Sequence, residues 1–377
     1  MKTKLPSLFI GLALLAGTRP VPAQPALGIV AANKQVILFW PITASGTNSV
    51  LQSATNLDSP DWVPATDAFP VNFGSKIYVS ITNVSSARFF RLSLVPPTAD
   101  GMAFIAAGSF TIGDTLDGES DAMPTNVYVS AFYMDTNLVS LSQWQEVYSY
   151  ATSHGYSFDN GGSGKATNQP VELVSWFDAV KWCNARSQQA GLTPVYYTDM
   201  NLTQVYNSLD DYTPYVNWSA SGYRLPTEAE WEKAARGGLS GQRFPWGNPI
   251  SENQANYLGN TAFSYDLGPN GYNTTFATDG VPYTSPVGYF LPNSYGLYDM
   301  AGNVFEWCYD WYQAQPYPAG SPYLGGIDPP GPASGNYRVF RGGGWFSVAD
   351  CARCAYRNFY FPSYDNLDIG FRCVRGL

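Results

Sequence analysis

The long stretch that follows Gly238 constrains the fold of this chain more than any other feature. For about a hundred residues it is rich in Gly, Pro, Asn and Tyr and keeps neither a helical nor a strand period, which is unusual inside a compact domain. The whole chain has 36 Gly and 28 Pro, and 16% of its residues are aromatic while only 13% are charged. We therefore expect a compact body of largely irregular loops held together by buried aromatic side chains.

The N-terminus has the pattern of a secretory signal at residues 1–23. Lys2 and Lys4 precede an apolar run from Leu8 to Ala16, and Val21-Pro-Ala23 supplies the small residues of a cleavage site. The alternative is a buried helix of the folded domain. Neither this run nor any later one is long enough to span a bilayer. We predict an exported protein, secreted, periplasmic or held at the cell surface, with no membrane span.

Net charge excludes some classes of partner. The formal charge is −9 with a single histidine, and loss of the three basic residues of the signal would leave −12. Such a chain has no electrostatic footprint for nucleic acid or an anionic membrane. Acidity suits a protein that holds hard cations, and it is equally an ordinary route to solubility.

Residues 26–94 have the pattern of a small all-β module. Short runs of β-branched and aromatic residues are separated by turn-forming clusters; they cover 35–40, 49–52, 76–81 and 88–94. The segment is similar to immunoglobulin-like or fibronectin-like β-sandwich modules, and we expect it to act as a spacer or docking module. Residues 95–100 read as a short stiff linker, and 101–377 as the second domain.

Three helix starts can be placed in the second domain. Ser140 and Gln143 form a capping-box pattern, and Thr227 and Glu230 form another directly after Pro226. Ser175 precedes a segment with apolar residues at helical spacing. The remainder shows no sustained period, so we predict an α+β, loop-rich domain.

An ordered series of motifs runs through residues 101–377. They are Gly222–Gly238, Phe244–Asn248, Tyr295–Trp307, Arg341–Trp345 and Gly370–Cys373. This series resembles the formylglycine-generating enzyme, or sulfatase-modifying factor, family, whose fold is similar to that of C-type lectins and is poor in regular secondary structure. The resemblance implies the fold, and it implies expectations for calcium, cysteines, copper and a peptide-binding cleft.

The resemblance implies two calcium (Ca²⁺) sites. The first would take oxygens from Asn256, Tyr257, Asp279 and Val281. The second would take carboxylates from Asp299 and Glu306 and carbonyl oxygens from Gly302 and Val304. Six to eight hard oxygens suit Ca²⁺, and irregular loops have carbonyl groups to spare. The alternative is that Asn256, Asp279 and Asp299 simply cap turns.

The family's copper site is two thiolates that hold Cu(I) beside the substrate cysteine, a donor set that suits this soft ion. At the first thiol position this chain has Ser347, and Gly344 stands where the family has serine. Cys351 lies near the second position without clearly matching it. The alternative is that Cys351 and Cys354 themselves form a catalytic thiol pair. By default we expect both cysteines to be structural.

We expect the other cysteines to have structural roles. Cys183 and Cys373 match a disulfide of the family. Cys354 matches half of a second bridge whose other position is Ala235, so Cys308 is the natural partner of Cys351 or Cys354. A sister branch of the fold binds non-haem iron through several histidines. Because this chain has only His154, we expect neither haem nor histidine-bound iron.

Phe305 and Arg357 match residues of the family's peptide-binding cleft. Arg357 could equally pair with a buried carboxylate. We expect an exported, calcium-stabilised binding or accessory module that lacks the two-cysteine copper site, with a peptide, protein or small-molecule ligand. The alternative is a divergent copper-dependent oxidase that acts on a sulfatase cysteine through Cys351 and Cys354.

Overall fold

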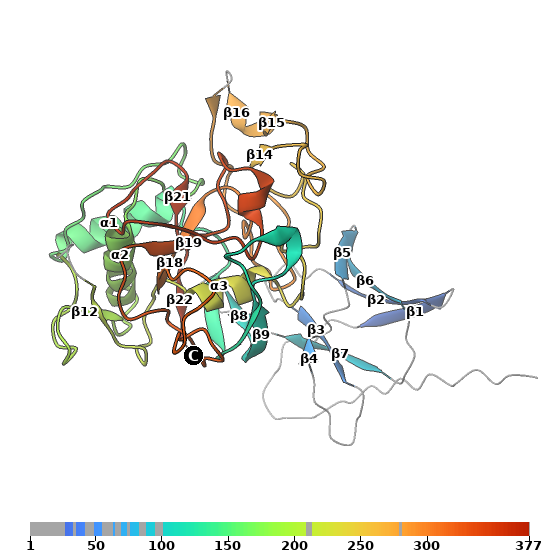
Figure 1. Ribbon diagram of the computed structural model, residues 1–377, viewed down its shortest axis with the longest axis horizontal. Helices are drawn as coiled ribbons and strands as arrows, with labels where there is room; N and C mark the ends of the chain where they lie inside the picture. The colour runs from blue at the N-terminus through green and yellow to red at the C-terminus, as the bar shows by residue number, and fades with distance from the viewer. Residues whose placement is uncertain are drawn as a thin grey trace, which may run out of the picture. The chain divides into compact units, whose positions relative to one another are not determined.

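The chain divides into two compact units, residues 1–97 and 98–377 (Figure 1). The computed structural model describes residues 27–32, 35–41, 49–54, 63–64, 69–73, 76–82, 88–94, 101–208, 213–278 and 281–376. The predicted signal (1–23) and linker (95–100) lie outside these residues. No helix in the described ranges is both long and apolar enough to cross a membrane.

The first unit is built only of antiparallel strands in its described part. One sheet has the order β1 (Gly28–Ala32), β2 (Gln35–Pro41), β6 (Lys76–Thr82), β5 (Phe69–Phe73), and the other β4 (Val63–Pro64), β3 (Ser49–Ala54), β7 (Phe89–Leu94). The four predicted strands correspond to β2, β3, β6 and β7. Two of the three unpredicted strands contain proline, which weakens a strand signal. The immunoglobulin-like or fibronectin-like character of the module stays a prediction.

The second unit contains three α-helices, and each begins at the residue predicted to cap it. They are α1 (Leu141–Ser153), α2 (Trp176–Gln189) and α3 (Glu228–Ala235). The side chain of each N-cap accepts a hydrogen bond from a first-turn amide, which satisfies one of the donors that a helix start leaves unpaired. In α2 and α3 the reciprocal bond completes a capping box, whereas Ser140 of α1 makes only the single bond.

Short strands complete the second unit. Those of three or more residues are β8 (Met102–Ile105), β9 (Gly108–Ile112), β10 (Thr125–Val129), β11 (Phe132–Asp135), β18 (Phe305–Trp311), β19 (Arg338–Arg341) and β20 (Asn358–Tyr360). Two-residue strands are β12 (Tyr196–Tyr197), β13 (Tyr215–Val216), β14 (Leu258–Gly259), β15 (Gly271–Tyr272), β16 (Ala277–Thr278), β17 (Val281–Pro282), β21 (Ile369–Gly370) and β22 (Val374–Arg375). The sheet that positions the candidate site has the order β20-β19-β18-β21. The α+β, loop-rich prediction is confirmed.

Aromatic side chains fill the core between helices and sheet. Trp144 of α1 and Trp182 of α2 stack at 5.9 Å between ring centroids, and Phe371 packs edge-on against both. The Trp182 indole also donates to the Trp144 carbonyl at 3.2 Å. Figure 1 shows α1 and α2 side by side, with loops making up most of the rest of the unit. Ring packing thus replaces much of the order that longer strands would supply.

Buried arginine–carboxylate pairs cross-link the loops. Arg372 grips Glu306 with two hydrogen bonds of 2.6 and 2.9 Å, and both side chains are fully buried. Further pairs join Arg186 to Asp135, Arg224 to Glu230, Arg341 to Glu232 and Arg357 to Glu228. In every pair except Arg341–Glu232 two guanidinium nitrogens bond the carboxylate, and this bidentate geometry lets the charges be buried without being left unpaired.

The caps of α1 and α2 provide a matched test of this local structure. Ser175→Ala removes a buried hydroxyl from a complete capping box, so we expect a loss of about 1–2 kcal/mol in the free energy of unfolding. Ser140→Ala removes a single bond, and we expect a loss of about 0.5–1 kcal/mol. Urea denaturation followed by far-ultraviolet circular dichroism measures both. An equal or larger cost at Ser140 would contradict the assignment.

Candidate functional site

The loop that follows β19 is the candidate site, because it contains the position of the family's first thiol. Its backbone is fixed at several points: the Trp345 amide donates to the Asn303 carbonyl at 2.8 Å, and the Leu258 amide donates to the Ser347 carbonyl at 2.9 Å. Ser347 is half-buried. A Cβ added at Gly344 would lie 3.0 Å from Cβ of Asp368, so Gly344 allows this close packing.

The two cysteines that follow this loop, Cys351 and Cys354, pack in different hydrophobic clusters. Cys351 is half-buried in the short 3₁₀ helix Ala349–Ala352 and packs against the core cluster that contains α1 and α2. Cys354 is fully buried in the second cluster, together with Trp231 of α3. Arg353 between them is pinned by ion pairs of 3.0 Å to Asp350 and 2.5 Å to Glu119. The two thiols of the Cys-x-x-Cys segment thus pack in different hydrophobic clusters.

Neither thiol is activated as a thiolate. Burial raises the pKa of Cys354 to about 12, with the nearby Glu232 charge adding to the effect and Arg236 opposing it. Burial also raises the pKa of Cys351, although a hydrogen bond with Tyr356 partly opposes the shift. Because Cu(I) binds thiolates and the nucleophile of thiol chemistry is the thiolate, these environments suit structural cysteines.

The remaining cysteines are buried. Cys183 and Cys373 have their sulfur atoms 3.5 Å apart, and the predicted disulfide between them stays a prediction. Cys308 shares its core cluster with Cys354, and its pairing with Cys351 or Cys354 stays a prediction. Among the described residues no group of three or more His, Cys, Asp or Glu side chains is arranged to hold a metal ion.

The two residues expected in a peptide cleft are buried. Phe305 is 4% exposed and packs against Phe340 at 4.8 Å. Arg357 donates to both carboxylate oxygens of Glu228 at 2.7 and 2.9 Å, which is the alternative role that the sequence allowed. In this arrangement both side chains support the core, and their role in a peptide-binding cleft stays a prediction.

The first predicted calcium site is described only in part. Asn256 is buried, and its side-chain amide donates to the Tyr283 carbonyl at 2.9 Å. The hydroxyl of Tyr257 donates to Asp266 at 2.5 Å. Val281 begins β17, and Asp279 lies outside the described residues.

At the second predicted calcium site, the surroundings of Asp299 are compatible with a bound cation. Its Oδ2 accepts from the Gly288 amide at 2.8 Å, while its buried Oδ1 has no hydrogen-bond partner in the described part of the chain. Burial raises the pKa of Asp299 to about 6. Asn137 Oδ1 is likewise without a partner, and a Cβ added at Gly288 would lie 2.8 Å from it. Two unpaired buried oxygens beside Gly288 are what a hard cation would satisfy.

The other predicted ligands of this calcium site are Glu306, Gly302 and Val304, and their surroundings differ from those of Asp299. Glu306 already has both oxygens bound by Arg372. Gly302 has a φ of +78°, and a Cβ there would lie 2.5 Å from the Asn256 carbonyl oxygen, so the close approach of the two loops requires glycine. Val304 is fully buried.

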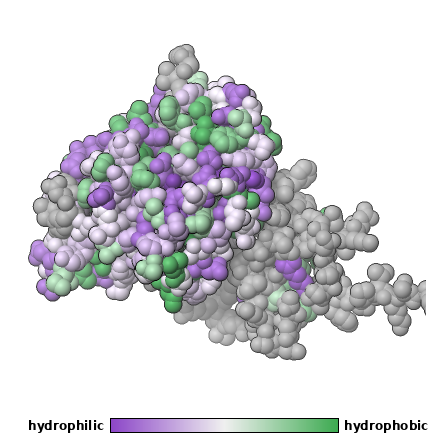
Figure 2. Space-filling model, viewed as in Figure 1, coloured by the Kyte–Doolittle hydropathy of each residue, from purple (hydrophilic) through white to green (hydrophobic). Residues whose placement is uncertain are grey.

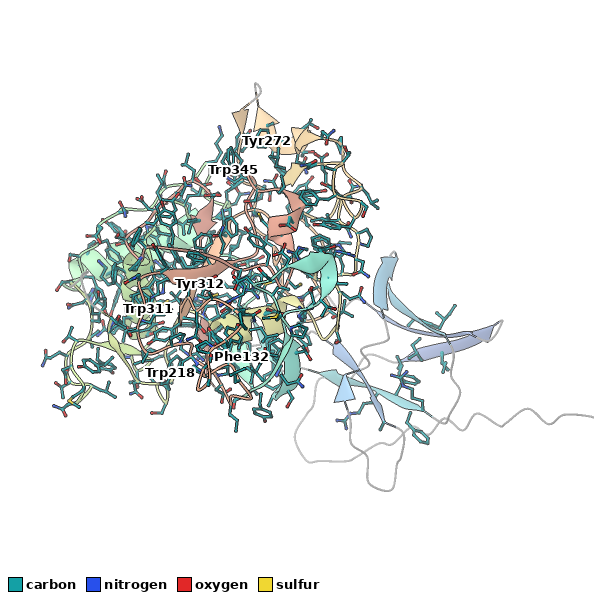
Figure 3. All side chains as sticks on the ribbon, viewed as in Figure 1. Phe132, Trp218, Tyr272, Trp311, Tyr312 and Trp345 are labelled. Carbon is teal, nitrogen blue, oxygen red and sulfur yellow. The ribbon has the colours of Figure 1, made fainter. Side chains whose placement is uncertain are left out.

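An aromatic group beside Ser347 was not predicted from the sequence. Tyr272, Trp345 and Phe346, called the Trp345 cluster below, have ring centroids 5.6–6.2 Å apart, and Phe346 is 57% exposed. Figure 3 shows Tyr272 and Trp345 close together at one end of the unit. On the face drawn in Figure 2, hydrophobic residues form separate patches among polar ones. The adjacent aromatic residues Trp345 and Phe346 are the local signal of this cluster in the sequence.

Thiol labelling tests the described cysteine environments. We expect iodoacetamide at pH 8 to modify the native protein at Cys351 only, because Cys183, Cys308, Cys354 and Cys373 are fully buried. Peptide mass spectrometry locates the label, and Cys351→Ser should abolish native-state labelling. Comparable modification of Cys354 before unfolding would show that its thiol shares the surface of Cys351.

Comparisons with known proteins agree with this geometry. The family model for the sulfatase-modifying factor enzyme 1-like domain matches residues 92–377. A formylglycine-generating enzyme of Thermomonospora curvata is 34% identical over 297 residues, which cover 73% of this chain and 93% of that protein. A protein of Paenibacillus barcinonensis named chaperone protein LppX is 31% identical over 303 residues, covering 79% of this chain and 98% of that protein.

A solved structure agrees as well. Treponema denticola variable protein 1 superposes with a TM-score of 0.55 and 29% identity, covering 78% of this chain and 98% of its own. The matched region of the family model includes the motifs, the loop after β19 and the C-terminal strands of the second unit. The chain therefore belongs to the FGE-sulfatase family and carries its sulfatase-modifying factor enzyme 1-like domain.

Proposed function

We propose that this protein is an exported, calcium-stabilised binding or accessory module of its family that does not carry out two-cysteine copper oxidation. The observation that carries the proposal is the donor set at the loop after β19. Ser347 occupies the position of the first thiol, and the side chains of Cys351 and Cys354 belong to different core clusters.

Copper does not fit these residues. A serine hydroxyl is a hard, neutral donor and binds Cu(I) poorly. Cys354 is fully buried against Trp231 and Ala235, and the raised pKa of its thiol disfavours the thiolate. One half-buried thiol, Cys351, is left to serve the site. We derive no oxidation step from this arrangement.

A binding role is supported by what the loop presents in place of a thiol. The Trp345 cluster exposes ring surface directly before Ser347, and large aromatic side chains supply contact area at low cost in conformational entropy. One relative is named a chaperone and one structural neighbour a variable protein, and both are matched over 98% of their length. The same fold thus occurs in proteins whose names imply no oxidase.

The second candidate is a divergent copper-dependent oxidase that uses Cys351 and Cys354 on a sulfatase cysteine. It is favoured by the 34% identity to a formylglycine-generating enzyme. In this candidate both thiols would have to reach one copper ion, while three ion pairs hold Arg353 between them.

Calcium is proposed as a structural ion. At the second site, Asp299 would supply its partnerless Oδ1, and the carbonyl oxygens of Gly302 and Val304 would complete the set. A bound cation would offset the cost of burying the Asp299 carboxylate, whose pKa is raised by burial and by the charge of Glu306. The first site would use Asn256, Tyr257, Asp279 and Val281.

Copper binding decides between the two candidates. We expect the calcium-loaded mature protein to lose Cu(I) completely to a bicinchoninate competitor, and Cys351→Ser and Cys354→Ser to behave identically to it. A sulfatase-motif peptide incubated with copper and oxygen should keep its cysteine. Tight Cu(I) binding that is lost in both variants, together with conversion of the peptide cysteine to an aldehyde, would establish the oxidase instead.

Calcium removal tests the structural ion. A ligand at a hundred times its dissociation constant stabilises the folded state by about 2.7 kcal/mol, so chelation with EGTA should lower the melting temperature by several degrees. Asp299→Asn should lose this calcium-dependent increment, and in EGTA it should be at least as stable as the wild type because an unpaired buried charge is gone. Glu146→Gln, on the exposed face of α1, is the matched control. An unchanged calcium response in Asp299→Asn would exclude this residue as a ligand.

A further inference from the structure

Two carboxylates beside the candidate loop, those of Glu172 and Asp368, have no basic partner. Most buried acids of the second unit pair with arginine, as Glu228, Glu230, Glu232 and Glu306 do. No ion pair involves Glu172 or Asp368 among the described residues. Glu172 is only 6% exposed, so its lack of a countercharge is costly.

The backbone brings these two acids together. The Leu173 amide donates to the Asn366 carbonyl at 3.1 Å, and a Cβ added at Gly370 would lie 2.7 Å from the Val171 carbonyl oxygen. The segment around Glu172 therefore runs along the segment around Asp368. Burial raises the pKa of both groups, that of Glu172 to about 7, and the negative charge of Asp368 adds to the shift at Glu172 while a hydrogen bond from Thr284 opposes it.

Lys165 is a basic side chain in the neighbouring segment, two residues after the bridge that joins Ser163 to Glu172. Its ammonium group lies over the ring of Tyr283 at 4.3 Å from the centroid. Tyr283 directly precedes Thr284. The chain thus places an ammonium group of its own on an aromatic face, and the two carboxylates have no ion-pair partner in the described part of the chain.

The Trp345 cluster borders the same two acids. The Trp345 indole donates to the Leu367 carbonyl at 3.0 Å, next to Asp368. Gly344, next to Trp345 on its other side, packs so closely on Asp368 that an added Cβ would lie 3.0 Å from Cβ and 3.4 Å from Oδ2 of that residue. Exposed ring faces and uncompensated carboxylates are therefore contiguous at the loop after β19.

From this juxtaposition we propose that the site binds a ligand through an organic ammonium group, held between the Trp345 cluster and the carboxylates of Glu172 and Asp368. The inference rests on the proposed binding function and names the chemistry of its ligand. Negative charge selects a cation, and aromatic faces favour an organic ammonium over a strongly hydrated metal ion. The ammonium would come either from a primary amine, as in a lysine side chain, or from a quaternary amine.

Paired probes test the proposal on the calcium-loaded mature protein. The probes are n-butylammonium and choline, with the uncharged analogues butan-1-ol and 3,3-dimethylbutan-1-ol. Titration calorimetry and tryptophan fluorescence should show saturable binding of at least one ammonium probe. We expect its uncharged analogue to bind about tenfold more weakly or not at all. The stronger of the two ammonium probes identifies the source.

Variants locate the binding. We expect the affinity for the ammonium probe to fall about tenfold in each of three variants, Asp368→Asn, Glu172→Gln and Phe346→Ala. A tenfold loss is the scale expected when one charge or one ring contact is removed. Asp365→Asn and Phe361→Ala, a carboxylate and a 49% exposed ring nearby in the chain, should leave binding unchanged. Thermal melts confirm that each variant is folded.

Several outcomes would overturn the inference. Equal binding of charged and uncharged probes would show a merely apolar surface, and displacement of the probe by added Ca²⁺ would assign the acids to a metal. Absence of saturable binding, or binding unaffected by Asp368→Asn and Glu172→Gln, would also reject it. None of these results changes the outcome of the Cu(I) competition, so the proposed loss of oxidase function is judged separately.

Discussion

The fully buried guanidinium of Arg341 holds together the elements around the candidate site. It pairs with Glu232 of α3, lies 3.7 Å from Glu228, and donates to the carbonyl oxygens of Cys354 and Ala355 at 2.9 and 3.0 Å. The end of β19, helix α3 and the chain that follows the 3₁₀ helix are therefore fixed to one another. Since a buried guanidinium must keep its partners, this arrangement leaves little freedom to redirect Cys354 toward Cys351.

That constraint also bears on the Cys351-x-x-Cys354 spacing, for which structural cysteines are the default expectation. In Cys351-Ala-Arg-Cys354 the intervening Arg353 is drawn toward Asp350 and Glu119, while Arg341 holds the Cys354 carbonyl. The two thiols consequently pack against different clusters. With Ser347 at the position that the resemblance assigns to the first thiol, we propose that the loop offers aromatic rings and carboxylates in place of two soft ligands.

Local features were predictable from the sequence and long-range pairings were not. Ser175 and Thr227 cap their helices because capping depends on residues three positions apart. The pairs of Arg341 with Glu232 and Arg357 with Glu228 join residues more than a hundred positions apart, and no local pattern shows them. For the same reason the sequence left open whether Arg357 lines a cleft or pairs with a buried carboxylate, and it did not show that Phe305 is buried. The contact of Trp345 with Leu367 and the unpaired carboxylates of Glu172 and Asp368 likewise depend on how loops meet.

The central claim is that this loop is a binding surface and not a copper centre. Anomalous diffraction at the copper absorption edge, from crystals grown anaerobically with Cu(I), tests it most directly. We expect no anomalous peak between Cys351 and Cys354, with the two sulfur atoms directed into separate core clusters. A copper ion bonded to both sulfur atoms would contradict the account and restore the oxidase as the function of this chain.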